Sequence, residues 1–293
     1  MGTIHCYSSY LRQKDDIALN AMSAGWMNGF VEIVLGSAVV IPIAVGYLGL
    51  DWVVDNAGFM MAFKTMPFLF DQWGSVLSVV AGVAWFGLLF FAGITSSLAM
   101  GTPWMGFVQD EFNWSKNKSA LILGFAILVM GLPTIFFFEK GVFDEYDYWT
   151  GTVSLVIFAL AEVILFAWVF GMDKGWKEIT DGADMRVPRF YRPIIKYITP
   201  LFIGIIFLSS LFKPLNGELS DWSLAFNSLI NGNGWPWAND SIINQIFHIN
   251  TGVQWVKEGI LTNMFYIDMS RFFLLACFFA LVAMVKVSQI LLA

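Results

Sequence analysis

Long apolar stretches separated by short polar ones dominate the chain. The longest, from Gly74 to Gln109, runs for 36 residues without an acidic or basic side chain, whereas about 20 apolar residues suffice to cross a bilayer as a helix. Charged residues and turn signals bound each stretch. The pattern predicts membrane-spanning helices at about residues 18–48, 74–108, 119–138, 148–172, 191–212 and 269–291.

The segments outside these spans carry a different pattern. Met1 to Leu11 is apolar or small but too short to cross a bilayer, so it is interpreted as half a helix. The segments 49–73 and 213–268 are rich in Trp, Phe and Asn and contain turn signals such as NGNG at 231–234. We expect both segments to form partly helical caps outside the membrane.

Composition supports a membrane protein and narrows its chemistry. Hydrophobic residues make up 58% of the 293 positions and charged residues 13%, against roughly 45–50% and 25% in soluble domains. Neither the two cysteines nor the two histidines have a second ligand at a metal-binding spacing. The chain also lacks a nucleophile–base pattern, a phosphate loop and a nucleic-acid-binding signature. We therefore predict neither an enzyme nor a nucleic-acid partner, and the lipid bilayer is the expected environment.

The distribution of Lys and Arg predicts the orientation of the spans. Alternate loops fall on opposite sides of the membrane, and residues 10–17, 110–118, 173–196 and the last turn belong to one side. This side carries eleven of the sixteen basic residues. The positive-inside rule places it in the cytoplasm, which predicts a multi-pass protein of the cell (inner) membrane with a cytoplasmic carboxy terminus.

Two polar residues occupy the middle of the first span. Asn28 and Glu32 are four residues apart, so a helix places both on one face. A carboxyl group at bilayer depth is costly unless it faces protein, water or a cation, which makes Glu32 a functional candidate. The alternative is a structural hydrogen bond with a protonated Glu32, because burial disfavours the charged form.

A denser polar cluster lies in the second span. Ala92, Thr95 and Ser96 belong to the run LLFFAGITSSLAMG, and hydroxyl and free carbonyl oxygens are ligands suited to a dehydrated Na⁺. Small and hydroxyl residues are equally typical of tight helix packing. The cluster alone leaves both interpretations open, and the presence of Asn28 and Glu32 favours the ion site.

Three further carboxyl groups lie in or near spans. Asp110 is at the cytoplasmic end of the second predicted span and Asp147 at the external start of the fourth. By themselves they are typical of solvated helix ends, and Asp147 also suits the positive end of a helix dipole. Glu162 lies inside the fourth span, and its spacing names no partner.

Several segments resemble one family of transporters. The string WFGLLFFAGITSSLAM at 85–100 closely resembles the eighth transmembrane helix of the neurotransmitter:sodium symporters. Other segments are similar to the same family in the family's order: YSSYLRQKDDI at 7–17, MNGFVEIVLGS at 27–37, FVQDEFNWSK at 107–116, FDEYDYWTG at 143–151, FGMDKGWKEI at 170–179 and VPRFYRPIIKYITP at 187–200. They cover most of residues 1–213, and the last span resembles the family's twelfth helix. The chain is identified as similar to the LeuT-like bacterial members.

The resemblance implies an all-α polytopic membrane protein with the LeuT-type fold. Residues 1–172 would form the second inverted repeat, from half of helix 6 through helix 10. Residues 173–293 would form two accessory helices, 11 and 12, with a long external loop at about 213–268. The implied function is sodium-coupled symport of an amino acid or similar small zwitterion by alternating access, with Na⁺ as the coupled ion.

The resemblance also implies roles for individual residues. Ala92 through its carbonyl, and Thr95 and Ser96 through oxygens, correspond to the second sodium site, and Asn28 to a ligand of the first. Glu32 stands where chloride-dependent members have a Ser that helps to hold the anion, so its carboxylate would replace chloride.

The remaining implied roles concern the solute and the two gates. Ser96, Met100 and Met1 match positions beside the substrate. Tyr10 and Asp110 match the cytoplasmic gate, and Asp147 matches the acidic half of the external gate.

Nothing in the chain resembles the family's first five helices or the first half of the sixth, which normally supply ligands to both sodium ions and to the substrate. One interpretation is a truncated or mis-started reading frame, and another is a split protein that pairs with an amino-terminal partner chain. The cost of exposing Asn28, Glu32 and Thr95 to lipid favours the first. A third interpretation is a non-transporting membrane subunit that binds a partner through residues 213–268.

Overall fold

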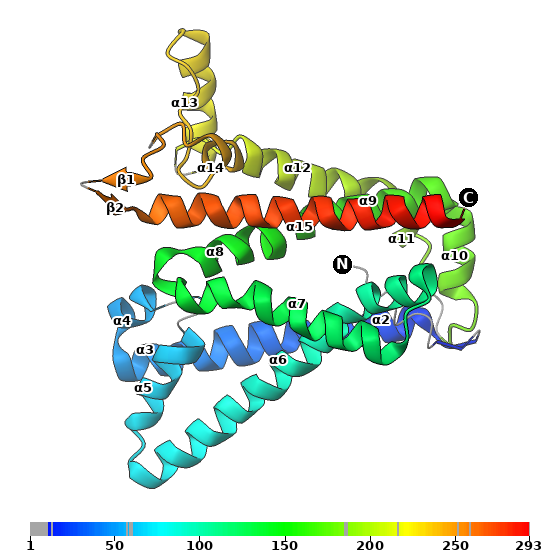
Figure 1. Cartoon of the computed structure of the whole chain (residues 1–293), viewed down its shortest axis with the longest axis horizontal. Helices are drawn as coiled ribbons and strands as arrows, with labels where there is room; N and C mark the ends of the chain where they lie inside the picture. The colour runs from blue at the N-terminus through cyan, green and yellow to red at the C-terminus, as the bar shows by residue number, and fades with distance from the viewer. Residues whose placement is uncertain are drawn as a thin grey trace. The chain divides into compact units, whose positions relative to one another are not determined.

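The computed structural model describes residues 11–292 except positions 13, 57, 59, 60, 185, 186, 216, 251 and 258. Within these residues, six helices are long and apolar enough to cross a membrane (Figure 1). They span Ile17–Leu48, Ser75–Phe112, Lys116–Phe136, Val142–Thr180, Tyr191–Leu211 and Asn263–Ile290. All six predicted spans are therefore confirmed, and the chain is an all-α polytopic membrane protein.

The ends of the fourth and sixth helices differ from the prediction. The fourth extends from Val142 to Thr180 and the sixth begins at Asn263, because helical hydrogen bonding continues through charged residues that a hydropathy pattern assigns to loops. The six helices are built from these elements: α2 (Ile17–Gly29), η1 (Phe30–Val40), α3 (Ile41–Leu48), α6 (Ser75–Phe112), α7 (Lys116–Phe136), α8 (Val142–Tyr146), η4 (Asp147–Val153), α9 (Ser154–Ile164), η5 (Leu165–Gly171), α10 (Met172–Thr180), α11 (Tyr191–Pro193), η6 (Ile194–Ile198), α12 (Thr199–Leu211) and α15 (Asn263–Leu292).

The connections contain shorter elements, and the expectation of partly helical segments at 49–73 and 213–268 is confirmed. The first segment contains α4, η2 and α5, and the second contains α13, α14 and a two-stranded antiparallel hairpin that was not predicted. Their bounds, with those of the short η3 helix, are α4 (Leu50–Asp55), η2 (Met61–Thr65), α5 (Met66–Asp71), η3 (Phe138–Lys140), α13 (Leu219–Ile230), α14 (Ile242–Phe247), β1 (Val256–Lys257) and β2 (Ile260–Leu261).

Backbone contacts divide the chain into two compact units. Among the described residues, the first unit comprises residues 11–103 and 177–187, and the second comprises residues 104–176 and 188–292. In the first unit Met66, Leu69 and Phe70 of α5 form a buried cluster. Partly buried side chains from α6 pack against it, and Trp85 Nε1 donates a 2.9 Å hydrogen bond to the carbonyl of Ala62. The short α5 helix thus packs against long helices of its unit.

The start of the first long helix is fixed by its capping residue. Asp16 is the N-cap of α2, and its carboxylate accepts 2.8 Å hydrogen bonds from the Leu19 and Asp184 backbone N–H groups. These hydrogen bonds lower the pKa of Asp16 because they favour the charged form. The cap therefore begins α2 and also holds the segment around residue 184 of the same unit.

In the second unit, α9 packs along α12, and α8 packs against the beginning of α15. The helices α13 and α14 and the β1–β2 hairpin gather near the amino-terminal end of α15 (Figure 1). These elements build one polar end of the unit, at which the fourth, fifth and sixth long helices meet.

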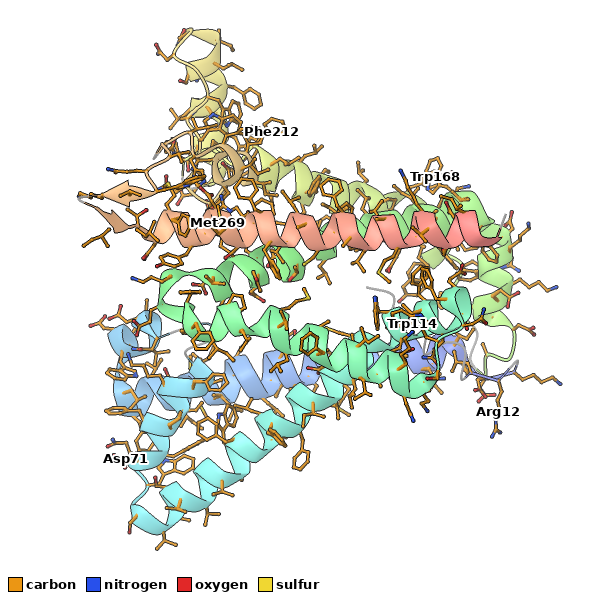
Figure 2. All side chains as sticks on the ribbon, viewed as in Figure 1. Arg12, Asp71, Trp114, Trp168, Phe212 and Met269 are labelled. Carbon is orange, nitrogen blue, oxygen red and sulfur yellow. The ribbon has the colours of Figure 1, made fainter. Side chains whose placement is uncertain are left out.

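Apolar side chains project from the surface of the long helices in both units (Figure 2). Ile33, Val76 and Leu121 are among the large hydrophobic residues with more than half of their surface exposed. The hydrocarbon of a bilayer and neighbouring transmembrane helices are the surroundings that such faces need.

Candidate functional site

The predicted pairing on the first long helix is present. Asn28 Nδ2 donates a 3.0 Å hydrogen bond to Glu32 Oε1, and both side chains are exposed in the first unit. Glu32 lies in the π-helical segment η1, whose Ser37 hydroxyl donates to the Glu32 carbonyl. Short π-helical segments are frequent at functional sites. The chain therefore holds an amide and a carboxyl group together at mid-span.

The hydroxyl groups of α6 are bonded within their own helix. Thr95 Oγ1 donates to the carbonyls of Phe91 and Ala92, at 2.9 and 3.1 Å. Because the single hydroxyl hydrogen has two acceptors, it can serve Phe91 and leave the Ala92 carbonyl to a ligand. Ala92, Thr95 and Ser96 are all exposed in the first unit. Their oxygens fit the hard, oxygen-rich ligand set that an alkali cation requires.

The exposure of these residues is itself informative. Four polar residues lie on helices that are long and apolar enough to span a membrane: Asn28, Glu32, Thr95 and Ser96. No other part of the described structure covers their side chains, which are exposed. Met100, one turn beyond Ser96, is also more than half exposed. Polar groups at membrane depth face protein, water or an ion rather than lipid. The first unit therefore presents exposed polar groups on helices that are long enough to span a membrane.

Asp147 begins the π-helical segment η4 in the second unit. Its side chain is exposed, and its Oδ1 atom lies only 3.0 Å from the point that a Cβ on Gly151 would occupy. The glycine thus leaves room for the carboxylate in its observed place. The position of the Asp147 carboxylate therefore depends on the absence of a side chain at Gly151 as well as on its own place in the helix.

The other predicted residues have varied surroundings. Asp110 is exposed near the end of α6, in the part that belongs to the second unit. Glu162 is half-buried in α9 and engaged with neighbouring groups. Met1 and Tyr10 lie outside the described residues.

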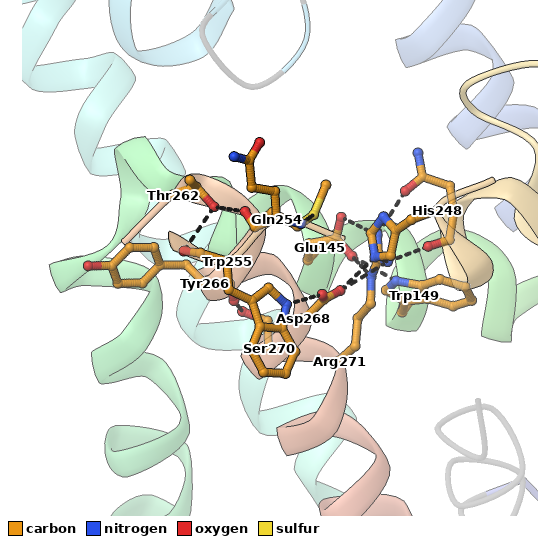
Figure 3. Close-up of polar contacts among 12 residues, drawn as sticks. Glu145, Trp149, His248, Gln254, Trp255, Thr262, Tyr266, Asp268, Ser270 and Arg271 are labelled. Atoms are coloured by element: carbon orange, nitrogen blue, oxygen red, sulfur yellow. Dashed lines mark hydrogen bonds and ion pairs between the residues drawn. The ribbon is translucent and has the colours of Figure 1, made fainter. Parts of the chain in front are cut away.

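A buried polar cluster at the start of α15 was missed by the analysis of the sequence (Figure 3). Arg271 Nε and Nη2 donate to both carboxylate oxygens of Glu145, at 2.7 and 3.0 Å. Asp268 Oδ1 lies 2.8 Å from His248 Nε2, and Asp268 Oδ2 accepts a 2.8 Å hydrogen bond from Trp255 Nε1. Asp268 and Arg271 lie three positions apart at the start of an apolar span. Charged residues at such a position were the signal in the sequence that could have indicated this cluster.

The sequence is similar to a known family and to several known proteins. The sequence model of the Sodium:neurotransmitter symporter family matches residues 1–252. An "uncharacterized sodium-dependent transporter" of Haemophilus influenzae is 25% identical over 223 residues, which are 72% of this chain and 47% of that protein.

Relatives from an archaeon and an insect are similar over a comparable share of the chain. An "uncharacterized sodium-dependent transporter" of Methanocaldococcus jannaschii is 27% identical over 218 residues, 71% of this chain and 43% of that protein. The "sodium-dependent nutrient amino acid transporter 1" of Drosophila grimshawi is 25% identical over 240 residues, 76% of this chain and 37% of that protein. The matched region therefore spans less than half the length of each of these relatives.

Proposed function

The chain belongs to the sodium:neurotransmitter symporter family, a family of transporters rather than enzymes, and from this premise we propose that it forms part of a sodium-coupled symporter. The solute would be an amino acid or a similar small zwitterion. Transport would proceed by alternating access, in which bound ions and solute shift the balance between outward-open and inward-open states through their different affinities for the two.

The exposed polar surface of the first unit is the observation that carries this proposal. Thr95 and Ser96 on α6, and Asn28 and Glu32 on the first long helix, offer oxygens at positions that lipid would penalise. Sodium ions and additional helices would complete their coordination. We propose that the amino-terminal helices of the fold, in the same or a partner chain, supply the rest of each site.

The proposed ion sites follow the roles implied by the resemblance. The carbonyl of Ala92 and the oxygens of Thr95 and Ser96 would bind one Na⁺, and the Asn28 side chain would bind another. The Glu32 carboxylate, already within hydrogen-bond distance of Asn28, would supply the negative charge that other members take from chloride. Its presence supports symport that is independent of chloride.

Solute and gate residues would surround these ions. Ser96, Met100 and Met1 would border the solute, Tyr10 and Asp110 would contribute to closure on the cytoplasmic side, and Asp147 to closure on the external side. In this arrangement residues 1–172 form the second repeat of the transporter core, and residues 173–293 form the accessory helices.

Binding of radioactive sodium tests the proposal directly. The protein is expressed from its complete gene and purified in detergent with any chain that accompanies it. We expect saturable sodium binding that unlabelled sodium displaces and choline does not, unchanged when chloride is replaced by gluconate. The variant in which Thr95 and Ser96 are both alanine should lose the sodium bound at that site, about half of the total, because ligands to one ion act as a unit. Adding Asn28→Ala should remove most of the rest.

Ser97→Ala is the matched control. Its hydroxyl group lies on the same helix but donates to the Gly93 carbonyl at 2.8 Å, so sodium binding should persist. Sodium binding that choline equals, or that the double substitution leaves undiminished, would overturn the proposal and favour a membrane subunit that does not transport.

A further inference from the structure

The guanidinium group of Arg271 joins three parts of the second unit (Figure 3). Two of its N–H groups bind the Glu145 carboxylate, and two more donate to the backbone carbonyl and the side-chain Oε1 of Gln245. His248 Nε2 lies 3.2 Å from its Nη1 atom. Arg271 is on α15, Glu145 is on α8, and Gln245 is on α14. One side chain therefore connects the sixth long helix, the fourth long helix and the segment between the fifth and sixth.

These contacts are largely shielded from solvent. The side chains of Arg271 and Glu145 are 13% and 12% exposed, and those of His248 and Asp268 are 12% and 10% exposed. Two-pronged pairing of an arginine with a carboxylate fixes geometry as well as charge. Removing one partner of such a shielded pair is costly because it leaves the other charge uncompensated. The cluster thus has a strongly preferred arrangement.

Through Glu145, the cluster contacts the residues on either side of Asp147. Trp149 Nε1 donates a 2.8 Å hydrogen bond to Glu145 Oε2, and the Arg271 guanidinium lies 5.7 Å from the centre of the Trp149 ring. Glu145 precedes Asp147 by two residues, and Trp149 follows it by two. Residues on both flanks of the exposed Asp147 therefore contact Arg271.

We propose that Arg271 is a positioning residue for the external gate. Through Glu145 and Trp149 it holds the first turn of η4, so that the Asp147 carboxylate is presented in the geometry required for closure. This inference rests on the proposed role of Asp147 in the transporter. It assigns to α15, outside the proposed repeat, a direct mechanical link to the proposed gate.

The same cluster also attaches the segment between α12 and α15. Gln245 is bound by Arg271, and His248 and Trp255 are bound by Asp268 one turn earlier on α15. A displacement of this segment would therefore be transmitted to Glu145 through α15. The link predicts that ligands or antibodies bound to residues 241–255 alter the closure of the external gate.

The rate at which bound radioactive sodium leaves the purified transporter tests the proposal. A loosened external gate opens an exit for the ion, so Glu145→Gln should accelerate release at least about fivefold, the lower end of typical couplings between linked sites. Arg271→Lys, which keeps the charge but not the two-pronged pairing, should also accelerate release. Size-exclusion chromatography and thermal melting identify variants that retain the fold.

Asp147→Asn distinguishes a gate effect from general loosening. If Arg271 acts through Asp147, Glu145→Gln should accelerate release much less in the Asp147→Asn background than in the wild type. Trp149→Phe, which removes the indole N–H and its hydrogen bond but keeps an aromatic ring, provides a milder variant that should act in the same direction. Asp240→Asn is the matched control, since it breaks the more exposed ion pair with Lys213, 2.5 Å long, without contacting Glu145.

Equal release rates in folded Glu145→Gln and wild-type protein would overturn the inference while leaving sodium binding, and hence the proposed function, intact. Acceleration that persists in full in the Asp147→Asn background would also overturn it. If wild-type protein binds no sodium, the proposed function fails. In that case amide hydrogen exchange of residues 144–153 tests the link alone: the Glu145→Gln variant should exchange faster there, and unchanged exchange would refute the link.

Discussion

At the scale of single residues, the polar groups on the long helices are satisfied locally. The Thr95 and Ser97 hydroxyls donate to carbonyls of their own helix, and Asn28 donates to Glu32 one turn away. Such hydrogen bonds lower the free-energy cost of exposing these polar groups to lipid. Because a hydroxyl group can donate and accept at the same time, its oxygen stays available to a cation. The proposed sodium ligands are therefore neither strained nor buried before the ion arrives.

Gly151 offers a test at this scale, because it has no side chain where the Asp147 carboxylate lies. A Cβ there would be 3.0 Å from Asp147 Oδ1, so Gly151→Ala should displace this exposed carboxylate by a few tenths of an ångström. We expect faster release of bound radioactive sodium, as for Asp147→Asn. Gly124→Ala, where a Cβ has nothing within 4 Å, should leave the rate unchanged. A normal release rate in Gly151→Ala would contradict the proposed placement of Asp147.

At the scale of elements, short helices outside the predicted spans join the long ones. Leu69 is 2% exposed and packs with Met66 and Phe70, while Leu48 and Ala81 pack against this cluster from two long helices. A small apolar cluster of this kind stabilises its surroundings through transfer of side chains from water and close packing. The connection between the first two long helices is thus a packed structural element.

The α5 cluster leads to a stability prediction. Leu69→Ala removes a buried side chain and should destabilise the first unit by about 2–5 kcal/mol, the usual cost of this change in a packed core. Thermal melting of the purified protein, followed by loss of the monodisperse peak, should show a lower midpoint. Leu77→Ala, at an exposed position of α6, should have a much smaller effect. Equal melting of Leu69→Ala and wild type would show that α5 does not hold the helices together.

At the scale of the whole molecule, exposed apolar surface and charge distribution determine the relation to the membrane. Helices such as α7 and α15 expose large apolar side chains along their length, and a bilayer provides the surroundings in which this surface is favourable. The excess of Lys and Arg in alternate loops then decides which end of each helix stays in the cytoplasm.

The orientation can be measured with single cysteines. We expect a cysteine in place of the exposed Gln289, near the end of α15, to react with a membrane-impermeant maleimide only after the cells are permeabilised. A cysteine at Ser220 of α13 should react in intact cells. Labelling is compared in a background in which Cys6 and Cys277 are replaced by alanine. The reverse pattern would contradict the predicted topology and place the Arg271 cluster on the cytoplasmic side.

The sequence by itself determined the class of protein, the six long helices, the shared face of Asn28 and Glu32, and the family. These features follow from hydropathy and helical periodicity, which act over a few turns, and from motifs such as the run around Thr95 that are contiguous in the chain. Whether Thr95, Ser96 and Asn28 bind sodium stays a prediction, because their coordination depends on groups beyond those described.

Only the tertiary structure decided which distant residues meet. Arg271 and Glu145 are 126 positions apart, and no periodic pattern links two such residues across separate helices. The α5 cluster and the contact of Gly151 with Asp147 likewise depend on how the backbone bends outside regular α-helix. Charged side chains that are shielded from solvent are stable only when paired, and tertiary packing decides which residues are close enough to pair. The order of residues in the sequence does not specify that proximity.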